Sequence, residues 1–114
     1  MGLNTSWAKL LGFALLIVGI LGFFTGDMLF GFGINNTHNI VHMATGLFGL
    51  WAGFSAGGQR AKGFNVLFGI VYLVVAVLGF VSMPFFVTFL SLNAADNWLH
   101  LFIGVTTTAV GLWA

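Results

Sequence analysis

The sequence is poor in charge and lacks cysteine. Its 114 residues include three Lys or Arg side chains and two acidic ones, both aspartate, so charged residues make up 4% and hydrophobic residues 60%. Soluble domains carry roughly a quarter charged residues, so this composition predicts an integral membrane protein. The absence of cysteine excludes disulfides and thiolate chemistry. A net charge of +1 excludes a polybasic surface, so we expect no nucleic-acid partner.

Long apolar stretches account for most of the chain. A membrane-spanning helix needs about 17–25 residues, and each stretch is near the lower limit of that range. We therefore predict an all-α fold, a bundle of four transmembrane helices, with the lipid bilayer as its first partner. No small-residue cleavage site follows the first stretch, which we interpret as a retained helix and not a signal peptide. The four stretches are approximately Trp7–Phe24, His38–Phe54, Phe64–Val81 and Asn97–Trp113.

The few positive charges predict the orientation. Lys9 precedes the first stretch, and Arg60 and Lys62 lie between the second and third. With four spans these residues fall on one side, and the positive-inside rule makes that side cytoplasmic. Both termini are then cytoplasmic, in a bacterial-type inner membrane or a photosynthetic membrane.

The second half of the chain resembles the first. Both halves contain the pattern N-x-x-[HD]-N-x-x-H-x-x-x-G, from Asn35 to Gly46 and from Asn93 to Gly104. We predict one domain, residues 1–114, made of repeats at about 7–57 and 64–114. Because each repeat holds two spans, the halves have parallel topology and are related by a pseudo-twofold axis along the membrane normal.

This repeated motif places polar side chains at the outer ends of the second and fourth helices. Asn35 and Asn93 are suited to cap these helices, and Asn93-x-x-Asp96 resembles a capping box. Capping does not explain the four polar residues that lie inside the helices, since such residues in a membrane face the bundle interior and need partners. They are Asn39, His42, Asn97 and His100.

The same helix faces are rich in glycine. Gly46 and Gly49 share a face with Asn39 and His42, and the fourth helix repeats this arrangement. Small residues let helix backbones approach closely in lipid. We expect these faces to pack against glycines of the first and third helices, namely Gly12, Gly19, Gly22, Gly69 and Gly79.

Three roles are open for the histidines. One is a hydrogen-bonded clasp between helices, and another is a conduit for protons or a small solute. The remaining one is ligation, for which His38, His42, Asp96 and His100 are the candidate ligands of a divalent metal. Alternatively, His42 and His100 bind haem or a (bacterio)chlorophyll, with Asn39 and Asn97 as hydrogen-bond partners of the ligands.

No nucleophile, base and acid fall together in the sequence, so we expect no enzymatic activity. The expected role is a small membrane subunit or scaffold with a buried Asn/His cluster, in a larger membrane complex or a homo-oligomer. The connectors at 25–36 and 82–93 are long and apolar, and we expect short interfacial segments in them. Pro84 is expected to mark the end of the third helix.

Nearly the whole chain resembles a known family. Residues Asn35–Leu50 read N-x-x-H-N-x-V-H-x-x-x-G-x-x-G-L, followed by GIVYLVVAVLGF from Gly69 and D-N-x-L-H from Asp96. These motifs are similar to those of small bacterial four-helix membrane proteins classified as a domain of unknown function. The resemblance implies the topology and the importance of six residues, but no activity. The six are His38, Asn39, His42, Asp96, Asn97 and His100.

Overall fold

The computed structural model describes residues 2–114 and is mostly helical, which confirms the predicted all-α class. The long helices are α1 (Leu3–Gly22), α2 (Asn36–Phe54), α3 (Ala61–Phe80) and α5 (Ala94–Trp113). The remaining elements are short: strands β1 (Met28–Leu29) and β2 (Phe32–Gly33), the 3₁₀ helix η1 (Ser55–Gly58) and helix α4 (Pro84–Leu90).

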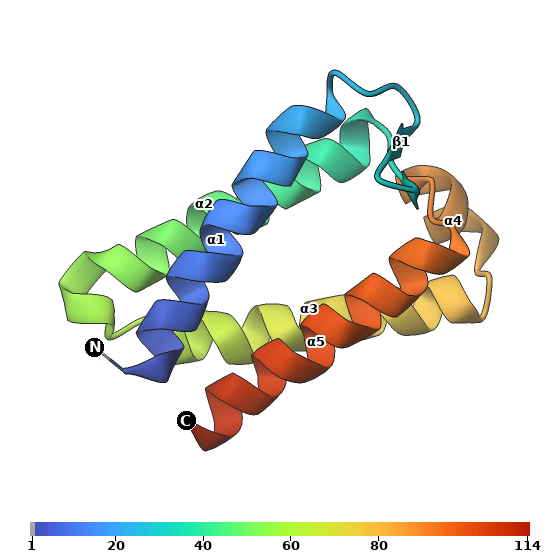
Figure 1. Ribbon diagram of the computed structural model, residues 1–114. Helices are drawn as coiled ribbons and strands as arrows, with labels where there is room; N and C mark the ends of the chain where they lie inside the picture. The colour runs from blue at the N-terminus through green and yellow to red at the C-terminus, as the bar shows by residue number, and fades with distance from the viewer. Residues whose placement is uncertain (1) are drawn as a thin grey trace.

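The long helices form two antiparallel pairs. Helix α1 packs along α2, and α3 packs along α5, whereas contacts between the pairs are sparse. The pairs diverge from the end where both chain termini lie (Figure 1). We call this the terminal end. The opposite end, where β1, β2 and α4 fill the space between the pairs, is the connector end.

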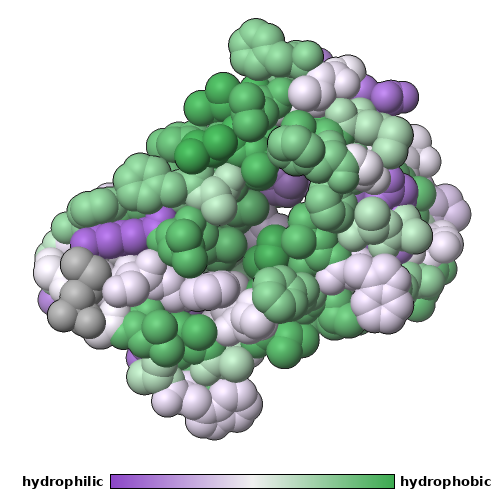
Figure 2. Space-filling view, in the orientation of Figure 1, coloured by the Kyte–Doolittle hydropathy of each residue, from purple (hydrophilic) through white to green (hydrophobic). Residues whose placement is uncertain are grey.

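Three helical segments are long and apolar enough to cross a membrane. They are α1, the continuous segment Asn36–Gly58, and α3. Helix α5 is also 20 residues long but is not among them, since Asp96, Asn97 and His100 make its first half polar. Hydrophobic side chains cover most of the face seen in Figure 2. Many large ones are exposed along the helices, as expected of surfaces that face lipid, including Leu10, Phe13, Ile17, Leu47, Trp51, Leu67, Val74, Phe102 and Val105.

Glycine backbones hold each pair together, as predicted. A methyl group at Gly12 would lie 2.9 Å from the carbonyl oxygen of Gly46 on α2. In the other pair, a methyl group at Gly69 would lie 2.6 Å from the backbone nitrogen of Thr108 on α5. Only residues without a side chain allow helices to approach this closely.

Polar contacts join the two pairs at the terminal end. Trp7 Nε1 donates to Thr107 Oγ1 at 3.0 Å, which links α1 to α5. Asn65 Nδ2 donates to Asn4 Oδ1 at 3.0 Å, which links α3 to α1. Asn65 and Thr107 are fully buried. Neither residue was predicted from the sequence to join the helix pairs, although Asn65 is conspicuous as a polar residue inside an apolar run.

The long connectors contain short secondary structure, as expected. One forms the β1–β2 hairpin and the other forms α4. Helix α3 ends at Phe80, shortly before Pro84 as expected, and Pro84 is the first residue of α4. Proline fits the first turn of a helix, where its missing N–H has no partner to lose.

Candidate functional site

Two asparagines begin helices α2 and α5 and also join the connectors. Asn35 Oδ1 accepts a hydrogen bond from the backbone nitrogen of His38 at 2.8 Å, and its Nδ2 donates to the Phe89 carbonyl at 2.9 Å. Asn93 Oδ1 accepts from the backbone nitrogen of Asp96 at 2.9 Å, and its Nδ2 donates to the Gly31 carbonyl at 3.0 Å. Each cap therefore ties its helix to the connector of the other pair, and the predicted capping roles are confirmed.

Asn39 and Asn97 lie against the partner helix of their own pair. A methyl group at Gly22 on α1 would overlap Asn39 Oδ1, and one at Gly79 on α3 would overlap Asn97 Oδ1. Both amides are buried, and within residues 2–114 neither Oδ1 accepts a hydrogen bond. These contacts occur at matching positions of the two halves. They make the asparagines part of the helix packing.

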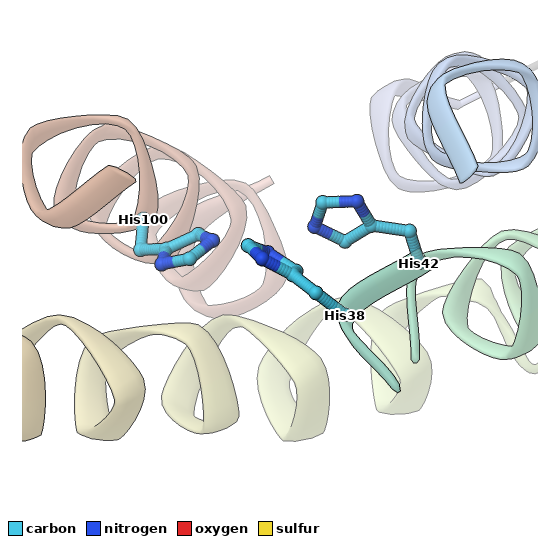
Figure 3. Close-up of side chains that lie close together, drawn as sticks. All are labelled: His38, His42 and His100. Carbon is cyan, nitrogen blue, oxygen red and sulfur yellow. The ribbon is translucent and has the colours of Figure 1, made fainter. Parts of the chain in front are cut away.

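The three histidines of the chain meet at the connector end. Figure 3 shows the side chains of His38 and His42 on α2 and of His100 on α5 converging between the helix pairs. One ring nitrogen from each lies within 4.8 Å of the other two. The ring centroids are 4.4 Å apart for His38 and His42, 5.5 Å for His38 and His100, and 6.3 Å for His42 and His100. We call these three residues the histidine cluster.

The hydrogen bonding of His38 defines its free nitrogen. Its Nδ1 lies 2.9 Å from the carbonyl oxygen of Leu90 and must carry the proton, because a carbonyl can only accept. In the neutral ring Nε2 then bears a lone pair. His38 thus presents a buried ring nitrogen that makes no hydrogen bond of acceptable geometry among the described residues, with the Gly33 backbone close by.

His100 presents a second bare nitrogen. Its Nδ1 is buried and has no hydrogen-bond partner within the described chain. Both His38 and His100 are 2% exposed. Leaving a buried polar atom unpaired costs about 1–3 kcal/mol, so two such atoms on neighbouring rings require an explanation.

Two small cavities adjoin the cluster. One, of about 90 Å³, is lined by all three histidines together with Tyr72 and apolar side chains. The other, of about 100 Å³, is lined by His42 and Asp96 and by aromatic residues of the β1–β2 hairpin. His42 lies between the two cavities and is only partly buried. It is the least buried member of the cluster.

Asp96, the fourth predicted metal ligand, is not in the group of converging ligand atoms. Its Oδ2 accepts a hydrogen bond from the backbone nitrogen of Asn93 at 2.9 Å, which completes the capping box. Gly33 packs against the same oxygen, since a methyl group there would lie 3.1 Å from it. The carboxylate is thus committed to starting α5. His38, at the equivalent position of α2, reaches across to Leu90 instead.

Tyr72 and the Leu90 carbonyl belong to this site but were missed from the sequence. Tyr72 is 4% exposed, and its ring centroid lies 5.6 Å from that of His100. It is the only tyrosine of the chain and interrupts the apolar run that follows Asn65, and this isolation was the available signal. The backbone carbonyl left no trace in the sequence.

Fold and site together describe a small all-helical protein whose apolar helices fit a membrane protein with a buried histidine cluster. The chain belongs to the family described as Domain of unknown function (DUF4383), whose model matches residues 6–113. No curated protein and no solved structure matches the chain.

Proposed function

We propose that this chain is a four-span integral membrane protein that binds one divalent transition-metal ion through His38, His42 and His100. The observation that carries this proposal is the bare Nε2 of His38, held beside two further imidazoles by the Nδ1 bond to Leu90. Histidine ligands of metals commonly donate their other N–H to a backbone carbonyl, which fixes the tautomer. Neutral imidazole suits ions such as Zn²⁺, Ni²⁺ and Cu²⁺.

A hydrogen-bonded clasp explains the cluster less well. In a clasp the buried polar atoms have hydrogen-bond partners, whereas His38 Nε2 and His100 Nδ1 have none among residues 2–114. A metal ion would satisfy both. Zn–N bonds of about 2.0–2.1 Å place two ligand nitrogens roughly 3.3 Å apart in a tetrahedral site. The ligand nitrogens lie within 4.8 Å of one another, so they need to approach by up to about 1.5 Å. Small rotations of the side chains supply that movement.

A tetrapyrrole also fits less well than a metal ion. Pockets for organic ligands generally measure roughly 300–1,000 Å³, several times the cavity of about 90 Å³ beside the three histidines. A larger surface hollow of about 460 Å³ is lined by Ala44, Leu47, Phe48 and Trp51, none of which ligates iron or magnesium. The geometry therefore favours a metal ion without a macrocycle.

The proposal includes the topology. We infer that α5 is the fourth span, because it has the length of α1 and α3 and packs along α3 as α2 packs along α1. The equivalent contacts of Gly22 with Asn39 and of Gly79 with Asn97 support two parallel repeats. The basic residues would lie at the terminal end, on the cytoplasmic side, with the histidine cluster near the opposite face. The proposed role is binding and not catalysis.

Metal binding to the purified protein tests this function. We expect detergent-solubilised protein, stripped with a chelator, to bind one equivalent of Zn²⁺ or Co²⁺ by calorimetry. His38→Ala, His42→Ala and His100→Ala should each weaken binding by at least about tenfold, since even hydrogen-bond partners of ligands contribute 10–100-fold. Asn65→Ala is the matched control, because it removes a buried polar side chain at the terminal end. Equal affinity in the histidine variants and the control would overturn the proposal.

A further inference from the structure

We propose that the metal ion in the histidine cluster keeps one coordination position for a small exogenous ligand, water or a compact anion, which the cavity beside Tyr72 receives. This inference rests on the proposed function. It concerns what the site binds in addition to the ion.

Among its described residues, the protein supplies three metal ligands and no fourth. Among the described His, Cys, Asp and Glu residues, the converging group comprises the three histidines alone. Asp96 is the nearest candidate by sequence, but its Oδ2 is occupied by the Asn93 backbone. Zinc sites with four protein ligands are closed, whereas three ligands leave a position for water or substrate. With three protein ligands, the histidine cluster would leave one coordination position open.

The cavity provides room on the open side of the cluster. It measures about 90 Å³ and touches His38, His42 and His100. A water molecule takes about 30 Å³ of liquid volume, so the space suits two or three waters or one ion of two or three heavy atoms. The remaining walls are mostly aliphatic or aromatic, from residues such as Val75 and Phe68. They would exclude larger polar ligands.

Tyr72 supplies the polar group that orients such a ligand. Its hydroxyl is buried, and the residue is part of the cavity wall. Thr45 is the side chain beside it, and the Thr45 hydroxyl donates to the Val41 carbonyl at 2.9 Å. Within residues 2–114 the Tyr72 hydroxyl makes no hydrogen bond of acceptable geometry. A metal-bound anion in the cavity would accept one from it.

Cobalt spectroscopy with azide as the probe tests this inference. Co²⁺ replaces Zn²⁺ in histidine sites, and its visible spectrum reports coordination. We expect azide to change the spectrum of the Co²⁺-loaded full-length protein in a saturable way. Tyr72→Phe should weaken azide binding by about tenfold or more, because hydrogen bonds to charged groups are among the stronger ones. The Co²⁺ affinity of this variant should stay the same.

A second variant addresses the cavity itself. Val75→Phe fills the space without removing a donor atom, and it should abolish the azide response while Co²⁺ still binds. A Co²⁺ spectrum indifferent to azide concentrations that perturb free Co²⁺ would overturn this inference and leave the proposed function standing. The same holds for an azide response unchanged in both variants. Failure of the unmodified protein to bind Co²⁺ or Zn²⁺ would instead overturn the proposed function.

Discussion

The imidazole rings of His38 and His100 face each other between the two helix pairs, with centroids 5.5 Å apart and ring planes inclined at 55°. His38 belongs to α2 and His100 to α5, helices that otherwise have few contacts. The pairs are joined by hydrogen bonds at the terminal end and by the connectors at the other. A ligand held by both rings would therefore act as a further link between the halves.

Metal should stabilise the folded chain through this link. A ligand that binds only the native state adds about 2.7 kcal/mol at a free concentration of 100 Kd. We expect Zn²⁺ to raise the thermal unfolding temperature of the metal-free protein in detergent, as measured by circular dichroism. The increment should disappear in His100→Ala.

Asn65→Ala separates this effect from general destabilisation. It removes the hydrogen bond to Asn4 at the terminal end, so the variant should unfold at a lower temperature. The rise in its unfolding temperature on adding Zn²⁺ should nevertheless equal that of the unmodified protein. A Zn²⁺ increment that survives in His100→Ala would show that the ion binds elsewhere.

The contact between Gly22 and Asn39 should be intolerant of a methyl group. Gly22→Ala forces its new carbon into Asn39 Oδ1, and Gly79→Ala does the same to Asn97. Overpacking of this kind typically costs about 1–3 kcal/mol. We expect both variants to unfold at lower denaturant fractions in mixed micelles.

Gly63 is the matched control for these glycines. It also lies in a long helix, but a methyl group there would meet nothing within 4 Å. Gly63→Ala should leave stability unchanged or raise it by up to about 1 kcal/mol, because alanine has the better helix propensity. Equal losses in all three variants would contradict the packing described here.

Neighbouring threonines on α5 should behave differently. Thr107 Oγ1 accepts the hydrogen bond from Trp7 Nε1, whereas Thr106 Oγ1 donates to carbonyls of its own helix. Thr107→Val leaves the indole N–H without its acceptor, and we expect a loss of about 0.6–2 kcal/mol. Thr106→Val should be close to neutral. Unfolding in mixed micelles measures both, and a larger loss for Thr106→Val would refute the proposed link between the pairs.

The sequence predicted features that depend on one helix or one turn. Helical spacing identified the glycine faces, and the Asn35 and Asn93 caps followed from local backbone chemistry. Asn39 and Asn97, which the predicted repeat pairs with each other, each lie against a glycine of the neighbouring helix in their own pair. These contacts are local to one hairpin.

Contacts between the pairs were harder to predict. The Leu90 carbonyl reaches His38 because α4 folds back between the pairs, and no periodic pattern encodes that path. Asp96 was assigned to the metal by symmetry, but a carboxylate is short enough to bond its own cap, and an imidazole at this position extends across the gap. Tyr72 on α3 lies beside His100 on α5 within one pair, and this contact too was not predicted from the sequence.

The number of spans can be decided because the chain lacks cysteine. Asp27, Gln59 and Ala114 are exposed, so a single cysteine introduced at any of them would be the one thiol that a maleimide can label. Four spans with the basic residues inside place Asp27→Cys outside and the other two in the cytoplasm. We therefore expect a membrane-impermeant maleimide to label Asp27→Cys in intact cells, and Gln59→Cys and Ala114→Cys only after permeabilisation.

If α5 lay outside the bilayer, leaving three spans, Ala114→Cys would react in intact cells. Gln59→Cys then serves as the internal control, because it stays protected in both topologies. Labelling of Ala114→Cys from outside would also remove the membrane-embedded setting assumed for His100.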